Sequence, residues 1–320
     1  MKKIFIPLAI IVTLVAAGAG VTRLTGFWAV PSEQGDISLN VPPKTVPTNS
    51  DKKPDHKNPD VSRPANTTDS LTPSATVIVR VNNDLPPEQQ DRTVYSWWFK
   101  SNNEHTSPEF DSKELTMVSG KGLYMGAQDN KKVYLTLDEG YENGYTPEIL
   151  DILKTNGVKV AFFVTADYVQ KQPKLIRRMV ADGHLVGNHT ATHPSLPKLT
   201  DAEIRQEIKV THDMVRQLTG QDMNLMRPSM GEYNSRVIDE INDLGYTPVF
   251  WSLAYRDWEV DKQPGREVAL YHVLDHLHPG AIILLHAVSK SNTEALDEII
   301  KAVKAKGYSF ASLDELKKSN

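Results

Sequence analysis

Hydrophobic and polar positions alternate in a regular way from Lys132 onward. Short runs rich in β-branched and aromatic residues, typical of strands, are separated by longer stretches with helical spacing and by glycines. Seven runs are predicted strands, at residues 132–137, 160–165, 184–187, 225–227, 247–252, 281–286 and 309–312. This part of the chain is therefore predicted to be α/β.

The helices between these strands have well-marked ends. Thr146 and Pro147 begin a helix that Gly157 ends, and "TDAE" from Thr200 is a capping box for a helix that Gly220 ends. Such frequent alternation predicts parallel strands with right-handed crossovers, and seven or eight units close most readily into a barrel. We predict a distorted (β/α)7 TIM-like barrel. An open doubly wound sheet is the alternative, but no glycine-rich phosphate loop follows the first strand.

The beginning of the chain predicts export. Lys2 and Lys3 precede an almost unbroken apolar run at residues 4–21, which ends in small residues. A basic start followed by such a run is typical of a signal peptide, and this run is also just long enough to span a bilayer. We expect residues 1–30 to be a signal peptide or a membrane anchor, and the protein to be secreted or membrane-anchored at the cell wall.

Two further segments separate this region from the regular part of the chain. Residues 31–74 are rich in Pro, Asn, Asp, Ser and Thr and predict a flexible linker. Residues 75–131 contain a short strand candidate at 75–81 and the aromatic cluster "YSWWF", and predict an N-terminal extension that packs on the barrel. Residues 132–320 are the predicted catalytic domain.

Composition excludes several classes of function. The chain has 320 residues, 39% of them hydrophobic, which is enough to bury a sizeable core. Lys and Arg number 36 against 40 Asp and Glu, so the chain lacks the basic excess of a nucleic-acid-binding protein. It has no cysteine, which excludes disulfides, thiolate zinc sites and cysteine nucleophiles. Any metal ion must be bound by histidines and carboxylates.

Polar residues of the kinds used in catalysis follow the predicted strands. These residues are Asp138, Glu139, His189, His193, Arg227, Asp257 and His286. The carboxyl ends of parallel strands all face one mouth of a barrel, so these side chains are expected to converge there. This convergence is the main indication of an active site.

Two histidines in "HTATH" suggest a metal site. His189 and His193 are four residues apart, and two histidines with one carboxylate plus open positions form a common catalytic shell for zinc or another divalent ion. Glu139 is the expected third ligand, and Asp138 the expected base that takes a proton from water. The alternatives are a hydrogen-bonded histidine pair and a solvated Asp-Glu turn.

The remaining polar residues suggest supporting roles. Arg227 could hold a carboxylate ionised. His286 could protonate a leaving group, and Asp257 could keep the His286 ring charged. Trp258 and Tyr233 have flat apolar faces of the kind that stack on sugar rings. The alternatives are a structural salt bridge, a hydrogen-bonded core histidine and simple packing.

Five short motifs, taken together and in order, resemble those of the polysaccharide deacetylase family, the NodB homology domain of carbohydrate esterases. They are "TLDEG", "HTATH", "RPSMGEY", "RDW" and "LLH", and they fall within residues 132–316. The stretches "YLTLDEGYENGYTPEIL", "YSWWF" and "HPGAIILLHAVSKSN" are most similar in sequence to peptidoglycan N-acetylmuramic acid deacetylases, which prepare the muramic-δ-lactam of spore cortex.

The resemblance implies a distorted seven-stranded TIM-like barrel and metal-assisted removal of acetyl groups from an N-acetylated sugar. It implies roles for individual residues: Asp138 as base, His189 and His193 as metal ligands, Arg227 as partner of Asp138, Asp257 as partner of His286, His286 as acid, the Tyr233 main-chain N–H as oxyanion donor, and Trp258 and Leu284 as acetyl-pocket lining. Two positions depart from the family pattern: Glu139 replaces the usual second Asp, and Met230 replaces a basic residue frequent in muramic deacetylases.

We therefore expect a divalent metal cofactor, zinc first, with cobalt, manganese or magnesium as other options. The expected substrate is peptidoglycan, with muramic acid preferred to glucosamine. The alternatives are a deacetylase of another polymer, such as a chitin-like polymer or an exopolysaccharide, and an inactive wall-binding module. If the signal segment is not cleaved, the membrane is a second partner.

Overall fold

The computed structural model of the chain describes residues 85–319. The predicted export signal within residues 1–30, the predicted linker at 31–74 and the strand candidate at 75–81 lie outside this described part. Among residues 85–319, no helix combines the length and the apolar character needed to cross a membrane.

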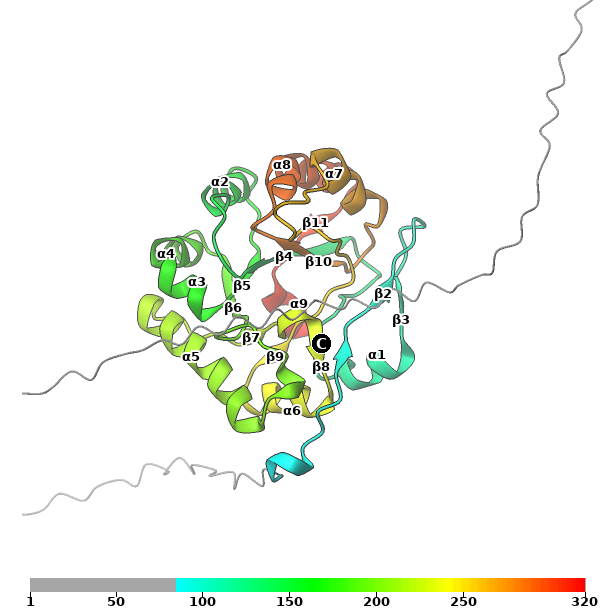
Figure 1. Cartoon of the computed structure of the whole chain (residues 1–320). Helices are drawn as coiled ribbons and strands as arrows, with labels where there is room; N and C mark the ends of the chain where they lie inside the picture. Colours follow the sequence, from blue (N-terminus) through cyan, green and yellow to red (C-terminus); the bar gives the residue numbers. More distant parts are fainter. Residues whose placement is uncertain (1–84, 320) are drawn as a thin grey trace, which may run out of the picture. The chain divides into compact units, whose positions relative to one another are not determined.

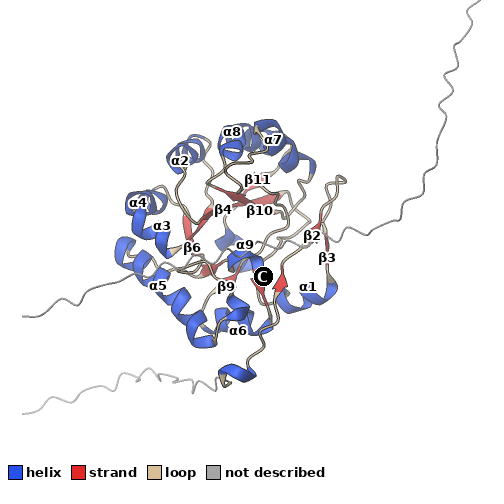
Figure 2. Cartoon of the chain, in the orientation of Figure 1, coloured by secondary structure: helices blue, strands red, loops and turns tan. Residues whose placement is uncertain are grey.

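A parallel sheet forms the centre of the described part (Figures 1 and 2). Its hydrogen-bonded order is β10 (Ile282–His286), β4 (Lys132–Glu139), β5 (Ala161–Val164), β6 (Leu185–Asn188), β7 (Leu225–Met226) and β9 (Thr247–Pro248), and β11 (Ser309–Phe310) also pairs with β4. Each of the seven predicted runs overlaps one of these strands, so the predicted set of strands is confirmed.

The two ends of this strand order are joined by backbone contacts. Leu253, just after β9, forms a parallel bridge with Ile283 of β10. Ser252 N–H donates to the Ile282 carbonyl at 3.0 Å, and Leu284 N–H donates to the Leu253 carbonyl at 2.9 Å. Strands β7 and β9 have only two residues each, so the closure is irregular. The distorted barrel is confirmed, and the open doubly wound sheet is excluded.

Helices surround the strands, as Figures 1 and 2 show. They are α2 (Thr146–Thr155), α3 (Ala166–Lys171), α4 (Pro173–Ala181), α5 (Asp201–Thr219), α6 (Ser235–Asp243), α7 (Arg266–Asp275), α8 (Lys290–Ala305) and α9 (Leu313–Ser319). The capping box at Thr200 is formed, and Gly220 ends α5 in the left-handed conformation that favours glycine. These helix boundaries were predictable because their signals are local.

Residues 85–131 contact the barrel mainly through aromatic side chains. Strand β1 (Tyr95–Ser96) pairs antiparallel with β8 (Glu232–Tyr233), while β2 (Phe99–Lys100) and β3 (Glu109–Phe110) form a hairpin that precedes α1 (Ser112–Val118). Trp97 is buried and donates its indole N–H to the Trp251 carbonyl at 2.8 Å. Its ring packs against Phe250 and Tyr233.

Candidate active site

The two adjacent acids at the end of β4 point in opposite directions. β4 extends to Glu139, and successive side chains of a strand face opposite sides of a sheet. Leu135 and Leu137 pack in the large core between strands and helices, and Glu139 shares their side of the strand. Asp138 instead faces the barrel interior, on the same side as Thr136. The two carboxylates are therefore separated by the strand itself.

Asp138 is held by a buried arginine. Arg227 Nη1 donates to Asp138 Oδ1 at 2.6 Å, and Arg227 Nη2 donates to the Thr136 hydroxyl at 2.9 Å. The guanidinium is fully buried and lies 4.2 Å from the ring centre of Phe163. Burial raises the pKa of the Asp138 carboxyl, but mainly the charge and the hydrogen bond of Arg227 more than offset this, so its pKa lies below the usual value. Asp138 is therefore ionised at neutral pH.

Glu139 does not lie where a third metal ligand was expected. Its carboxyl oxygens accept hydrogen bonds from the Thr146 hydroxyl at 3.3 and 3.5 Å, on the side where Tyr168 also lies. Burial, together with the negative charges of Glu142 and Asp138, raises its pKa well above the usual value. The alternation of β4 explains the correction, because a residue next to the inward-facing Asp138 must face the helices.

His189 and His193 converge as expected. Their Nε2 atoms are 3.2 Å apart, and His189 Nε2 lies 3.5 Å from Asp138 Oδ2. His189 Nδ1 is 2.8 Å from the Arg227 carbonyl, a position from which it donates and leaves Nε2 as the open nitrogen. Burial lowers the pKa of both rings, to about 3 for His193, so both imidazoles are neutral.

His286 lies beside Asp138 on the neighbouring strand, since the two residues are register partners in β10 and β4. Asp257 Oδ1 is 2.7 Å from His286 Nδ1, and Asp257 Oδ2 accepts the His286 main-chain N–H at 2.8 Å. Burial lowers the pKa of His286, but the Asp257 carboxylate and Asp138 outweigh it, so the pKa is raised. The predicted Asp257–His286 pair is formed.

Sequence reasoning missed Asn292 and Thr136. Asn292 in α8 is buried and donates its side-chain amide to Asp257 Oδ2, which fixes that carboxylate opposite His286. Thr136 donates its hydroxyl to the Ile283 carbonyl at 2.7 Å while accepting from Arg227. Thr136 begins "TLDEG" and Asn292 ends "HPGAIILLHAVSKSN", but neither was given a role, because each meets its partner only through the fold.

The three predicted substrate-binding residues differ in exposure. Trp258 is 41% exposed and its ring centre is 5.4 Å from that of His286, so its face is available at the mouth. Leu284 is buried and lies two residues before His286, on the same side of β10. The Tyr233 side chain is fully buried against Trp97 and Phe250, so its ring is not a platform for a sugar.

The histidine pair fits a divalent ion. Two nitrogen ligands of a tetrahedral zinc ion, each at about 2.0–2.1 Å, are about 3.3 Å apart, close to the 3.2 Å between the two Nε2 atoms. Both rings are neutral and keep an open nitrogen, as metal binding requires. Within residues 85–319, no group of three or more histidines and carboxylates is arranged as a metal site.

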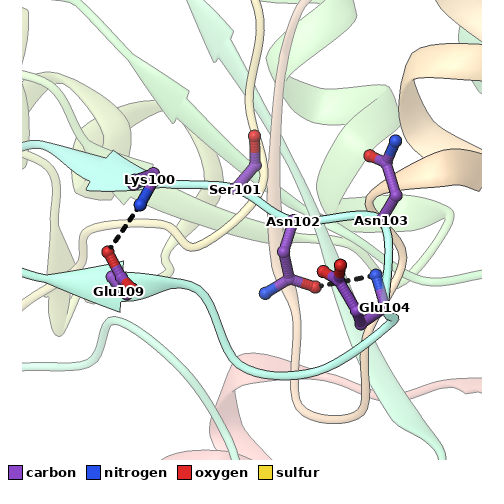
Figure 3. A pocket seen from close by; sticks show the side chains of 6 residues that line it. All are labelled: Lys100, Ser101, Asn102, Asn103, Glu104 and Glu109. Atoms are coloured by element: carbon purple, nitrogen blue, oxygen red, sulfur yellow. Dashed lines mark hydrogen bonds and ion pairs between the residues drawn. The ribbon is translucent and has the colours of Figure 1, made fainter.

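A separate pocket lies at the β2–β3 hairpin and holds none of these residues. Figure 3 shows the side chains that line this cavity of about 460 Å³: Lys100, Ser101, Asn102, Asn103, Glu104 and Glu109. Lys100 and Glu109 form an ion pair across it at 3.0 Å, with both side chains largely exposed.

Comparison with known proteins agrees with this geometry. The family model described as polysaccharide deacetylase matches residues 125–249. Peptidoglycan-N-acetylmuramic acid deacetylase PdaA of Bacillus subtilis is 43% identical over 224 residues, which are 69% of this chain and 85% of that protein. Peptidoglycan-N-acetylglucosamine deacetylase PgdA of Listeria monocytogenes is 36% identical over 190 residues, 59% of this chain and 40% of that protein.

Solved structures give the same grouping. The structure of B. subtilis PdaA, a family 4 carbohydrate esterase, matches with a TM-score of 0.69 and 40% identity, over 71% of this chain and 98% of that one. A CE4 family pseudoenzyme from Bacillus anthracis matches with a TM-score of 0.57 and 34% identity, over 60% of this chain and 67% of that one. With the barrel, the motif residues at its mouth and these relatives in agreement, the chain belongs to the polysaccharide deacetylase family of carbohydrate esterases.

Proposed function

We propose that this protein is a metal-dependent hydrolase that removes N-acetyl groups from the muramic acid residues of peptidoglycan. One observation carries the proposal: an ionised carboxylate and a histidine with a raised pKa are register partners on adjacent strands, next to a convergent pair of neutral histidines. Groups whose environments separate their pKa values in this way are suited to base and acid roles.

Asp138 and His286 divide the proton transfers between them. A water molecule attacks the acetyl carbonyl carbon, and Asp138, held by Arg227, takes the proton from that water. His286, held by Asp257, then gives a proton to the amide nitrogen. The C–N bond breaks, and the products are acetate and an amino sugar. Asp138 keeps the orientation of its proton-accepting oxygen because Arg227 occupies the other one.

Family 4 carbohydrate esterases are metal-dependent in general, and here His189 and His193 would hold the ion. A divalent ion bound there would polarise the acetyl carbonyl and lower the pKa of water. The chain itself keeps both imidazoles neutral and places His189 Nε2 3.5 Å from Asp138 Oδ2 and 3.2 Å from His193 Nε2. Zinc is the first candidate because its ligand spacing matches the histidine pair.

Muramic acid is the preferred sugar in this proposal because the chain resembles PdaA over 85% of that protein's length. Glucosamine is the alternative, supported by the PgdA relatives. Formation of muramic-δ-lactam requires deacetylated muramic acid, and we propose that the product of this protein is used in that way. The similar B. anthracis structure is described as a pseudoenzyme, but an inactive wall-binding role for this chain is opposed by the paired Asp138 and His286 with their supporting residues.

Acetate release from defined glycans tests the function. The full chain, loaded with zinc, would be incubated with peptidoglycan glycan strands stripped of stem peptides, with chitin oligosaccharides and with an acetylated exopolysaccharide. We expect free acetate from the first substrate, and mass spectrometry should place the acetyl loss on muramic acid. Acetyl loss from glucosamine alone would replace the substrate, and no acetate from any polymer would refute the enzyme activity.

We also propose that the protein acts outside the cytoplasm. The support is the basic and apolar pattern of residues 1–30 together with a substrate that lies in the cell wall. Fractionation of the source cells, followed by N-terminal sequencing, would test this proposal. The protein should be found in the membrane or wall fraction, and recovery in the cytoplasmic fraction would contradict it.

A further inference from the structure

The turn that carries the two histidines has an unfavourable backbone conformation. Thr190 has φ of 68° and His193 has φ of 61°, both in the left-handed region. L-residues rarely adopt this region, and a β-branched residue such as threonine does so least readily. Such a conformation persists only when the surrounding structure holds it, and it is common at functional sites.

Glu207 supplies the central part of that support. This residue lies in α5, and its Oε2 atom accepts hydrogen bonds from the main-chain N–H groups of Ala191 at 2.9 Å and Thr192 at 2.8 Å. Its Oε1 atom accepts the Thr192 hydroxyl at 2.9 Å. Hydrogen bonds to a carboxylate are stronger than neutral ones. One side chain therefore fixes two of the three residues that lie between the histidines.

Other contacts tie the ends of the turn. Asn188 donates to the Ile208 carbonyl of α5 at 2.8 Å and accepts from Thr190 N–H at 2.8 Å. The Thr190 hydroxyl accepts from His193 N–H at 3.0 Å and is 3.0 Å from the Ser229 hydroxyl. These contacts hold residues 188, 190 and 193, but they leave the main-chain N–H groups of residues 191 and 192 to Glu207.

We infer that Glu207 is a positioning residue of the metal site. By fixing the turn, its carboxylate keeps the Nε2 atoms of His189 and His193 within 3.2 Å of one another. The inference rests on the proposed function, because a preformed pair matters only if the pair binds an ion. Without the carboxylate, two main-chain donors lose their partner and the turn can relax out of its left-handed conformation.

Glu203 provides a matched control. It lies one helical turn earlier in α5, and its Oε2 atom accepts from Thr200 N–H at 2.7 Å and from the Thr200 hydroxyl at 2.8 Å. These bonds have the same chemistry as those of Glu207, but they close the capping box of α5 itself. Removing Glu203 therefore weakens the helix without freeing the histidine turn.

The test compares zinc binding by the full chain and the variants Glu207→Ala, Glu207→Gln and Glu203→Ala. Calorimetric titration of metal-free protein with zinc chloride gives Kd, and acetate release at increasing zinc gives the half-saturating concentration. Loss of a residue that supports a metal ligand typically weakens affinity about 10- to 100-fold, so we expect such a rise in Kd for Glu207→Ala. We expect no change for Glu203→Ala, although its Tm should fall.

Glu207→Gln should recover much of the affinity, because the amide oxygen still accepts hydrogen bonds. At saturating zinc, the KM of Glu207→Ala for glycan should stay near the wild-type value. The inference is overturned if Glu207→Ala binds zinc like wild type, or if wild type binds no zinc. If Glu207→Ala does not fold, Glu207→Gln decides: it keeps one acceptor oxygen instead of two, so its zinc Kd should rise by a smaller factor, while that of Glu203→Ala should not rise. A wild type that binds zinc but releases no acetate refutes the proposed function, while the Kd comparison still tests Glu207.

Discussion

The protein contains two pairs of histidines with the same four-residue spacing, and the structure uses them differently. His189 and His193 lie in the turn after β6, whereas His272 and His276 lie at the end of α7. The first pair brings two Nε2 atoms within 3.2 Å beside the Asp138 carboxylate. The second pair stacks its rings, with centres 4.4 Å apart.

The difference lies in which ring nitrogens remain open. His272 Nε2 is 3.2 Å from the Ala254 carbonyl, and His276 Nδ1 is 2.8 Å from the His272 carbonyl. His272 also packs on Tyr255, with ring centres 4.8 Å apart. These rings fill space and satisfy backbone carbonyls. Spacing alone therefore does not predict a metal site; the surrounding structure must also bring the two Nε2 atoms together and place a carboxylate beside them.

The largest predicted effect is a difference in kcat between variants of Asp138, which lies beside the first histidine pair, and of Asp275, which lies beside the second. Asp138→Asn keeps an acceptor for Arg227 but removes the proposed base, so kcat should fall about 10²- to 10⁴-fold. Asp275→Asn, at an exposed acid next to His276, should leave kcat unchanged. Steady-state acetate release at saturating zinc measures both. Equal rates for Asp138→Asn and wild type would remove the mechanism.

The second prediction compares the pairs directly. His193→Ala removes a proposed ligand, so zinc Kd should rise at least about 100-fold, beyond the usual effect of a supporting residue. His276→Ala should leave zinc Kd unchanged, because its Nδ1 serves a carbonyl of its own helix. Calorimetric titration of metal-free protein measures both values. Stronger weakening by His276→Ala than by His193→Ala would reverse the interpretation of the two pairs.

The third prediction concerns a histidine whose pKa moves upward, unlike that of His193. In the proposed mechanism His286 acts in its protonated form, so activity should be lost as pH rises through its folded-state pKa. Asp257→Asn removes the charge that raises this pKa and leaves burial, which lowers it. The alkaline limb of the kcat/KM profile should therefore move to lower pH. Asp275→Asn should leave the limb in place, and an unmoved limb in Asp257→Asn would exclude His286 as the acid.

The strands, helix caps and motif residues were predictable because they depend on local signals. The seven apolar runs, the Thr200 capping box and the glycine ends of helices all act within a few residues. The convergence of Asp138, Arg227 and His286 followed from one further rule, that parallel strands share an edge at their carboxyl ends.

Other parts of the site depend on the fold. Asn292 reaches Asp257 across 35 positions of sequence, and Thr136 reaches Arg227 across 91. The left-handed Thr190 runs against its local preference, so no pattern predicts it. The orientation of Glu139 was predictable in principle, since a strand that continues through residues 138 and 139 must send them to opposite faces.

The smallest predicted effect concerns Glu139, whose carboxyl group faces the helices and not the first histidine pair. Burial and the charges of Glu142 and Asp138 raise the folded-state pKa of Glu139 well above 4.5, although hydrogen bonds from Thr146 and Tyr168 act in the opposite direction. Its contribution to stability is thus fully present below the unfolded-state pKa and is lost as pH rises through the folded-state pKa. Glu139→Gln, which stays neutral, should have a larger free energy of unfolding than wild type at neutral pH. The difference should shrink toward pH 4.5.

Urea denaturation at several pH values measures this difference, and zinc titration of the same variant shows whether Glu139 is a ligand. We expect the zinc Kd of Glu139→Gln to equal that of wild type, because the carboxyl faces Thr146 and the helices. The matched variant is Glu142→Gln, whose carboxylate accepts from Gly144 N–H and the Tyr168 hydroxyl in the same cluster. Weaker zinc binding in Glu139→Gln alone would mean that the side chain turns to the ion when it binds.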